Sequence, residues 1–173
     1  MRSRIIHVGL IGKTNSGKST FINSIVGEKR SKENKKINTT QESVTGILNV
    51  KNTQIIFYDT PGLILLKKNN IIQKKQNTEL WEAINNVDLI LFIIDIVTFN
   101  NYNTVNAIEK IKETKKPVIV VFNKIDLIQK DIILSYIKEL NVTNLIDDFF
   151  LISAKYNRGL DLIKKYLVSK SKY

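Results

Sequence analysis

An eight-residue stretch near the start of the chain, residues 12–19, constrains the fold more than any other feature. It is GKTNSGKS, which matches G-x-x-x-x-G-K-[ST], the pattern of a phosphate-binding loop. An apolar run precedes it at residues 5–11, and apolar residues at helical spacing follow it at residues 20–26. These flanks argue against a chance glycine turn, the alternative interpretation. The sequence therefore predicts a strand, a phosphate-binding loop and a helix in this order.

The predicted loop carries groups that suit the phosphates of a nucleotide. Its glycines let the backbone curl around an anion, and the N–H groups of the loop and of the helix start point at that anion. Lys18 is expected to reach the β- and γ-phosphates, and Ser19 to offer its hydroxyl to Mg²⁺. The expected nucleotide-binding residues of this segment are Asn15, Ser16, Gly17, Lys18, Ser19 and Thr20.

The composition is typical of one globular domain, which we expect to occupy residues 1–173. The absence of cysteine excludes disulfides and thiolate metal ligands, and it fits a reducing compartment. No signal-peptide pattern opens the chain, and no apolar run reaches the ~20 residues of a transmembrane helix. The 27 basic and 16 acidic residues give a net charge of +11. Such a charge favours polyanionic partners such as RNA or an anionic membrane surface, although a lysine-rich genome bias is an equal alternative.

Apolar runs of β type alternate with amphipathic helical segments, which is typical of an α/β fold with a mainly parallel sheet. Residues 44–50 and 53–59 are expected to form a hairpin through a short turn. Further strands are expected at residues 88–94, 118–122 and 149–152, and further helices at residues 78–87, 103–113, 131–140 and 159–170. Residues 28–42 show no periodicity and are expected to form a long mobile loop. The helix at 131–140 is expected to bury Ile132, Ile133, Tyr136, Ile137 and Leu140.

Two motifs in the first half of the chain are candidates for contact with a γ-phosphate and its metal. Asp59 ends a strand and begins Asp-Thr-Pro-Gly, a position that suits Mg²⁺ bound through a water. Gly62 can bring its backbone N–H close to the γ-phosphate because no Cβ blocks the approach. Thr40, in the long loop, can give its hydroxyl to the metal. A simple turn and a solvated threonine are the alternatives.

Two motifs in the second half are candidates for contact with the base. Asp126, in Asn-Lys-Ile-Asp, can accept hydrogen bonds from N1–H and the 2-amino group of guanine, which adenine lacks. The stem of Lys124 can cover the base, and Asn123 can tie this loop to the phosphate-binding loop. A strand-to-helix turn capped by Asp126 is the alternative.

The second base motif is the triplet Ser153, Ala154 and Lys155, which follows the last predicted strand. Here the N–H of Ala154 can meet guanine O6, and Lys155 can pack on the base. The phosphate-binding loop, Asp-Thr-Pro-Gly, Asn-Lys-Ile-Asp and Ser-Ala-Lys all fall at the carboxyl ends of predicted strands, where open α/β sheets bind ligands.

Taken in order, these motifs resemble the full set of the P-loop GTPases, and the resemblance covers essentially the whole chain. More narrowly, the chain is similar to the GTPase domain of the Era family, within the TrmE-Era-EngA group. The features that carry this likeness are Asn15, Gly46-Ile47 and residues 54–63. Ser16 and Gln41 depart from it, because Era proteins usually have Val and Arg there.

The resemblance implies a P-loop NTPase sandwich of three layers, with a mostly parallel six-stranded sheet and one antiparallel edge strand. It implies an enzyme that hydrolyses GTP to GDP and phosphate as a molecular switch. The catalytic residues would be Lys18, Thr40 and Gly62, and the Mg²⁺ ligands Ser19, Thr40 and Asp59.

Two details of the resemblance bear on the rate of hydrolysis. Leu63 stands where Ras-type enzymes have a water-orienting Gln, so slow intrinsic hydrolysis is expected. Asn15 corresponds to an asparagine that helps to hold K⁺ in related enzymes, which makes K⁺ a candidate second cofactor.

For partners, the resemblance implies the small ribosomal subunit and its 16S rRNA during subunit maturation. Era proteins contact RNA mainly through a KH domain, which we expect to be absent from this chain. A monomer in the cytoplasm is expected, with peripheral association at the inner membrane as a further candidate.

Several alternatives to an Era-type function stay open. One is the GTPase domain of a tRNA-modification or EngA-type ribosome-assembly protein. Another is the cytosolic domain of a membrane iron transporter, and a non-enzymatic one is a septin-like GTP-binding structural module. A kinase is disfavoured, because the Asn-Lys-Ile-Asp motif selects guanine and no acceptor site is visible.

Overall fold

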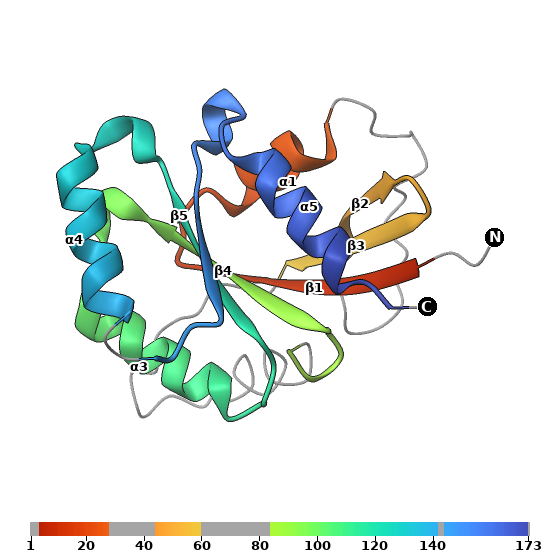
Figure 1. The fold of residues 1–173 in the computed structure, drawn as a ribbon, viewed down its shortest axis with the longest axis horizontal. Coiled ribbons are helices and arrows are strands. Elements are labelled where there is room, and N and C mark those ends of the chain that lie inside the picture. Colours follow the sequence, from red (N-terminus) through yellow and green to blue (C-terminus); the bar gives the residue numbers. More distant parts are fainter. Residues whose placement is uncertain (1–3, 28–43, 60–83, 142–143, 173) are drawn as a thin grey trace.

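The computed structural model describes residues 4–27, 44–59, 84–141 and 144–172. In this part of the chain six strands form one sheet in the order β2-β3-β1-β4-β5-β6 (Figure 1). The strands are β1 (Arg4–Ile11), β2 (Val44–Val50), β3 (Thr53–Asp59), β4 (Leu89–Asp95), β5 (Val118–Asn123) and β6 (Asp148–Leu151). Strand β2 pairs antiparallel with β3 at one edge, and all other pairs are parallel. The predicted sheet is confirmed.

Helices cover both faces of the sheet, which gives the three predicted layers. The helices are α1 (Lys18–Val26), α3 (Asn101–Lys112), α4 (Lys130–Asn141) and α5 (Leu160–Lys170). One buried cluster contains the apolar residues of α1 and α5, and a second contains those of α3 and α4. Two pairs of helices therefore bury opposite faces of one sheet.

Strand β4 shows how its sequence leads to this position. All but the last of its residues are buried, and successive side chains point to opposite faces. Leu89, Leu91 and Ile93 pack in the first cluster, whereas Ile90, Phe92 and Ile94 pack in the second. A nearly continuous apolar run is what a parallel strand covered on both faces requires.

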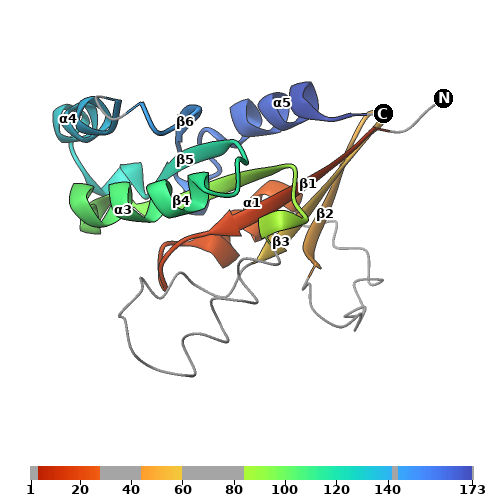
Figure 2. The same ribbon diagram turned by 90° about the horizontal axis from the view of Figure 1, so that it is seen from below.

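The two ends of the described chain lie side by side. Both views place the segment after α5 beside the start of β1 (Figures 1 and 2). Ile5 and Lys172 exchange backbone hydrogen bonds there as an isolated antiparallel bridge. This junction lies at the opposite end of β1 from the phosphate-binding loop. Among the described residues, none of the helices combines the length and hydropathy needed to cross a bilayer.

Some predicted boundaries and core positions were wrong. Helix α3 starts at Asn101 rather than 103, because the side chain of Asn100 caps it by accepting the N–H of Asn103. Ile132 is 40% exposed, since the buried stripe of α4 runs through Ile133 and Ile137 and leaves its neighbour on another face.

One predicted helix and one predicted loop fall largely on residues that the structure does not describe. Of the helix expected at 78–87, residues 84 and 85 are helical, and the turn into β4 has begun by residue 86. The loop expected at 28–42 lies outside the described residues, as does all of that helix before residue 84.

Three short 3-10 helices were not predicted. Each follows the carboxyl end of a strand: η1 (Ile96–Thr98) after β4, η2 (Ile125–Leu127) after β5, and η3 (Ala154–Tyr156) after β6. Turns of three residues leave little periodic signal in a sequence. Two of them matter for the site, because η2 and η3 begin where predicted ligand-binding residues lie.

Candidate nucleotide-binding site

The loop between β1 and α1 depends on its two glycines. A Cβ on Gly12 would lie 2.5 Å from the carbonyl oxygen of Ile93, and one on Gly17 would lie 2.2 Å from the side-chain nitrogen of Asn123. Gly17 also has φ 96°, in the left-handed region that suits glycine. Any larger residue at either position would push apart the loop and the strands beneath it.

The start of α1 is arranged to receive an anion. Gly17 occupies the N-cap position without a side-chain cap, and the first turn contains no acidic residue. The N–H groups of this turn and the helix dipole thus form a site for negative charge. The ammonium of Lys18 lies over the loop and donates to the carbonyl of Gly12 at 2.9 Å. Ser19 and Thr20 are exposed at the same turn.

Asp59 lies beside this loop. It ends β3 and pairs in register with Leu10 of β1, two residues before Gly12. Burial raises the pKa of its carboxyl above the ordinary value, and the opposing charge of Lys18 only partly offsets this. The half-buried carboxylate of Asp59 and the exposed hydroxyl of Ser19, at the start of α1, are hard oxygen ligands of the kind that Mg²⁺ prefers. The chemistry of Asp59 and Ser19 suits a magnesium site, and their role in binding Mg²⁺ stays a prediction.

Asn123 joins three loops into one structure. Its buried side chain donates to the carbonyl of Ser16 at 3.0 Å and accepts the N–H of Ala154 at 3.0 Å. The predicted tie between Asn123 and the phosphate-binding loop is confirmed. The N–H of Ala154 differs from expectation, because it already donates to Asn123 rather than being reserved for guanine O6.

Lys124 makes a second tie to the same loop. Its ammonium donates to the carbonyl of Asn15 at 2.9 Å and to the carboxylate of Asp95 at 2.6 Å. Asp95 was not among the predicted site residues. A signal was present, since Asp95 ends an apolar strand as Asp59 does, but no known motif includes it here.

Asp126 lies in a hollow that suits the base. Its carboxylate accepts the hydroxyl of Ser153 at 2.5 Å. The hollow has a volume of about 210 Å³. Its lining residues are Gly17, Thr20, Asn123, Lys124, Asp126, Leu127, Ser153 and Lys155. Residues from the phosphate-binding loop, from the end of β5 and from the end of β6 thus border one space.

The described residues bring most of the predicted site together. The loop residues, Asp59, and the residues at the ends of β5 and β6 all lie at the carboxyl edge of the sheet, with β4 between β1 and β5. Thr40, Gly62 and Leu63, which the sequence predicts near the γ-phosphate, lie outside the described residues. The structure therefore describes the phosphate-binding loop and the base hollow, and not the segments that contain Thr40, Gly62 and Leu63.

Comparisons with known proteins agree with this geometry. A family model described as "50S ribosome-binding GTPase" matches residues 7–124. GTPase Era of Buchnera aphidicola (subspecies Acyrthosiphon pisum, strain Tuc7) is 38% identical over 164 residues, which are 94% of this chain and 57% of that protein. The chain thus spans little more than half of this relative.

Two solved structures of Era are similar over almost the whole chain. Aquifex aeolicus Era bound to GDP and AlF₄⁻ superposes with a TM-score of 0.79 at 32% identity, covering 98% of this chain and 58% of that one. Era in complex with MgGDPNP and a segment of 16S ribosomal RNA gives a TM-score of 0.80 at 32% identity, covering 99% and 58%. The chain therefore belongs to the family of 50S ribosome-binding GTPases, and over almost its whole length it is similar to Era proteins.

Proposed function

We propose that this chain binds GTP with Mg²⁺ and hydrolyses it to GDP and phosphate as a molecular switch. The observation that carries the proposal is the double contact of Asn123, to Ser16 in the phosphate-binding loop and to Ala154 beside the hollow. It holds an anion site and a base site at a fixed separation. One ligand with phosphates and a purine would occupy both.

Guanine is the base that this hollow suits. The Asp126 carboxylate offers acceptors, and guanine supplies the matching N1–H and 2-amino donors. Ser153 now donates to that carboxylate, which holds it in place for the base. Adenine would leave a desolvated carboxylate without donors, which is costly. Guanine O6 would share the N–H of Ala154 with Asn123, and Lys155 would pack against the ring.

Several residues would act on the phosphates. Lys18 and the N–H groups at the start of α1 would stabilise negative charge on the β- and γ-phosphates. Ser19, Asp59 through a water, and Thr40 would hold Mg²⁺, which supplies charge neutralisation between the phosphates. Gly62 would contribute a backbone N–H at the γ-phosphate. Because Leu63 cannot orient a water, hydrolysis without a partner would be slow.

The biological process is proposed from the relatives. The family description names the ribosome, and a solved Era structure contains 16S ribosomal RNA. The charge of +11 supports a polyanionic partner. We therefore propose that the chain acts in maturation of the small ribosomal subunit. A cytoplasmic monomer is the proposed state, and peripheral association with the inner membrane stays a further candidate. A role in tRNA modification or EngA-type assembly is the second candidate.

Binding to purified small ribosomal subunits tests this assignment. The chain is incubated with a non-hydrolysable GTP analogue or with GDP, across a salt series, and bound protein is measured by co-sedimentation. The proposal predicts tighter binding with the GTP analogue, because a switch presents a partner with two different surfaces. Equally weak and salt-sensitive binding in both states would mean that the charge of the domain attracts RNA generically.

A further inference from the structure

Asp95 uses both oxygens of its carboxylate at the edge of the candidate site. One oxygen accepts the N–H of Val97 at 3.0 Å and caps the short helix η1. The other accepts the ammonium of Lys124 at 2.6 Å. The side chain is mostly shielded, with 15% exposed, so its charge is less screened than that of a surface carboxylate.

The pairing of β4 with β5 places Asp95 next to Lys124. Asp95 ends β4 and pairs in register with Asn123, which ends β5. The next residue, Lys124, adopts φ 67°, a left-handed conformation that is uncommon for a residue with a side chain. Its side chain passes to Asp95 on one side and to the carbonyl of Asn15 on the other.

Two successive residues at the end of β5 thereby hold two successive carbonyls of the phosphate-binding loop. Asn123 donates to Ser16, and Lys124 donates to Asn15. The first tie is buried and needs no further support. The second comes from a flexible, partly exposed lysine, whose side-chain entropy opposes a fixed position. The ion pair with the carboxylate of Asp95 offsets the entropy that Lys124 loses when its side chain is held in one position.

We propose that Asp95 is a positioning residue of the nucleotide site, which holds Lys124 between the phosphate-binding loop and the base. The carboxylate anchors the ammonium, so that the lysine stem stays along the hollow and the Asn15 carbonyl stays bonded. This inference rests on the proposed function, because Lys124 matters to a ligand only if a base occupies the hollow. Asp95 itself does not touch the ligand.

The substitution Asp95→Asn separates the two roles of the carboxylate. An amide oxygen can still accept the N–H of Val97, so the cap of η1 is kept. The amide has no charge, so the ion pair with Lys124 is lost. A residue that acts only as a cap would therefore tolerate this change.

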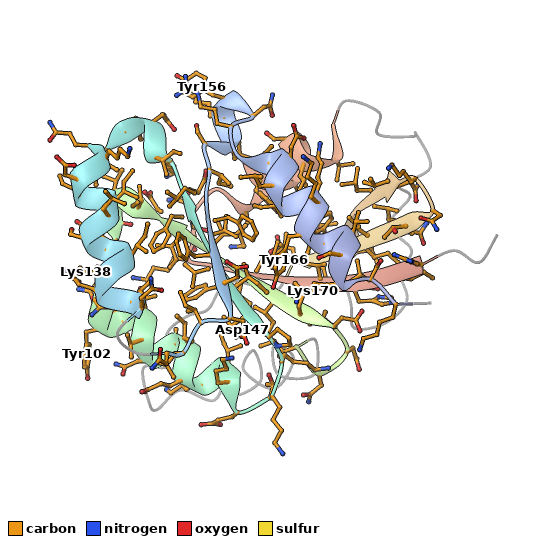
Figure 3. All side chains as sticks on the ribbon, viewed as in Figure 1. Tyr102, Lys138, Asp147, Tyr156, Tyr166 and Lys170 are labelled. Carbon is orange, nitrogen blue, oxygen red and sulfur yellow. The ribbon has the colours of Figure 1, made fainter. Side chains whose placement is uncertain are left out.

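Asp147 provides a matched control. Its carboxylate also accepts one lysine ammonium, from Lys112 at 2.6 Å, and one backbone N–H, from Val118 at 2.8 Å. Asp147 lies just before β6, and Tyr156 lies in the η3 turn just after this strand. Figure 3 shows these two labelled residues at opposite ends of β6, so Asp147 lies at the end away from the candidate site. Asp147→Asn removes the same kind of ion pair far from the site.

The experiment measures GDP affinity and GDP dissociation rate for the unmutated chain, Asp95→Asn and Asp147→Asn, with thermal unfolding of each without nucleotide. Loss of one charge-assisted contact is expected to weaken GDP binding about tenfold in Asp95→Asn, mainly through faster dissociation. Asp147→Asn should bind GDP as the unmutated chain does. The two variants should unfold at similar temperatures.

A double-mutant cycle with Lys124→Met distinguishes positioning from a general effect on the fold. If Asp95 acts through Lys124, adding Asp95→Asn to Lys124→Met should change GDP affinity less than twofold. Unchanged GDP affinity in Asp95→Asn alone, or an equal loss in the Lys124→Met background, would overturn this inference while leaving the proposed function standing. Absence of GDP binding by the unmutated chain would overturn both.

Discussion

The side-chain amide of Asn123 donates to the carbonyl of Ser16, 3.0 Å away and 107 positions earlier in the chain. The same amide accepts the N–H of Ala154, which lies 31 positions later. One buried side chain thus links the phosphate-binding loop to both segments that border the base hollow. The nucleotide site depends on this link, since each segment belongs to a different strand.

Replacing Asn123 by Ala removes both hydrogen bonds and leaves a buried carbonyl and a buried N–H without partners. We expect the free energy of unfolding to fall by about 2 to 4 kcal/mol, and GDP binding to fall below detection. Urea unfolding and fluorescent-GDP titration measure the two effects. Asn49→Ala is the control, because Asn49 is exposed on β2, and its loss should cost no more than about 0.5 kcal/mol. Similar losses in both variants would contradict the account.

Gly17→Ala should abolish nucleotide binding. The new methyl group would lie 2.2 Å from the amide nitrogen of Asn123, in a residue that already has φ 96°. Gly27→Ala is the matched control, since Gly27 also has a positive φ of 77° but nothing within 4 Å of an added Cβ. Backbone strain alone should cost Gly27→Ala about 1 to 3 kcal/mol of stability and leave GDP affinity unchanged. The account fails here if both variants bind GDP equally well.

Asp59 should make stability depend on pH. Because burial raises its pKa in the folded chain above the ordinary value of 3.8, the folded state favours the protonated form. The resulting stabilisation is fully present below pH 3.8 and is lost as pH rises through the raised folded pKa. Asp59→Asn should therefore raise the unfolding temperature without nucleotide at pH 7.

A measurement at acid pH and the Mg²⁺ dependence of GTP affinity both check the role of Asp59. At acid pH, where Asp59 is protonated, the stability difference between the variant and the unmutated chain should shrink. The variant should also lose most of the dependence of GTP affinity on Mg²⁺, because an amide is a weaker ligand than a carboxylate. A lower unfolding temperature for Asp59→Asn at pH 7 would contradict the assigned direction of the pKa.

Potassium should accelerate GTP hydrolysis relative to sodium. Asn15 is exposed in the phosphate-binding loop, and the resemblance to related enzymes gives it a role in holding K⁺. Phosphate release is measured in matched KCl and NaCl buffers, for the unmutated chain and for Asn15→Ala. The difference between the salts should vanish in the variant. Equal turnover of the unmutated chain in both salts would reject a potassium site.

Strands and motifs were predictable where residues close together in the sequence determine the structure. The nearly continuous apolar run of β4 indicates burial on both faces, and the structure agrees. The tie from Asn123 to the phosphate-binding loop was also predictable, because both segments follow strands whose carboxyl ends meet at one edge of a parallel sheet.

The contacts that the sequence did not predict join segments that are far apart in the chain and close in the folded structure. Asp95 pairs with Lys124 only because β4 and β5 lie in register, and nothing in the local sequence of either residue indicates it. The bond from the N–H of Ala154 to Asn123 likewise depends on how closely the ends of β5 and β6 approach. The predicted burial of Ile132 was wrong, because an apolar residue next to the buried stripe of a helix has the same local pattern as a member of that stripe.

Selectivity for guanine over adenine decides whether Asp126 and its hollow bind the base of GTP. Affinities for GDP and ADP are measured by calorimetry on the unmutated chain and on Asp126→Asn. The account predicts that GDP binds at least about a hundredfold more tightly than ADP, because only guanine offers donors to Asp126. Asp126→Asn should weaken GDP binding at least about tenfold and leave ADP binding unchanged. Equal affinities for GDP and ADP in the unmutated chain would contradict the account.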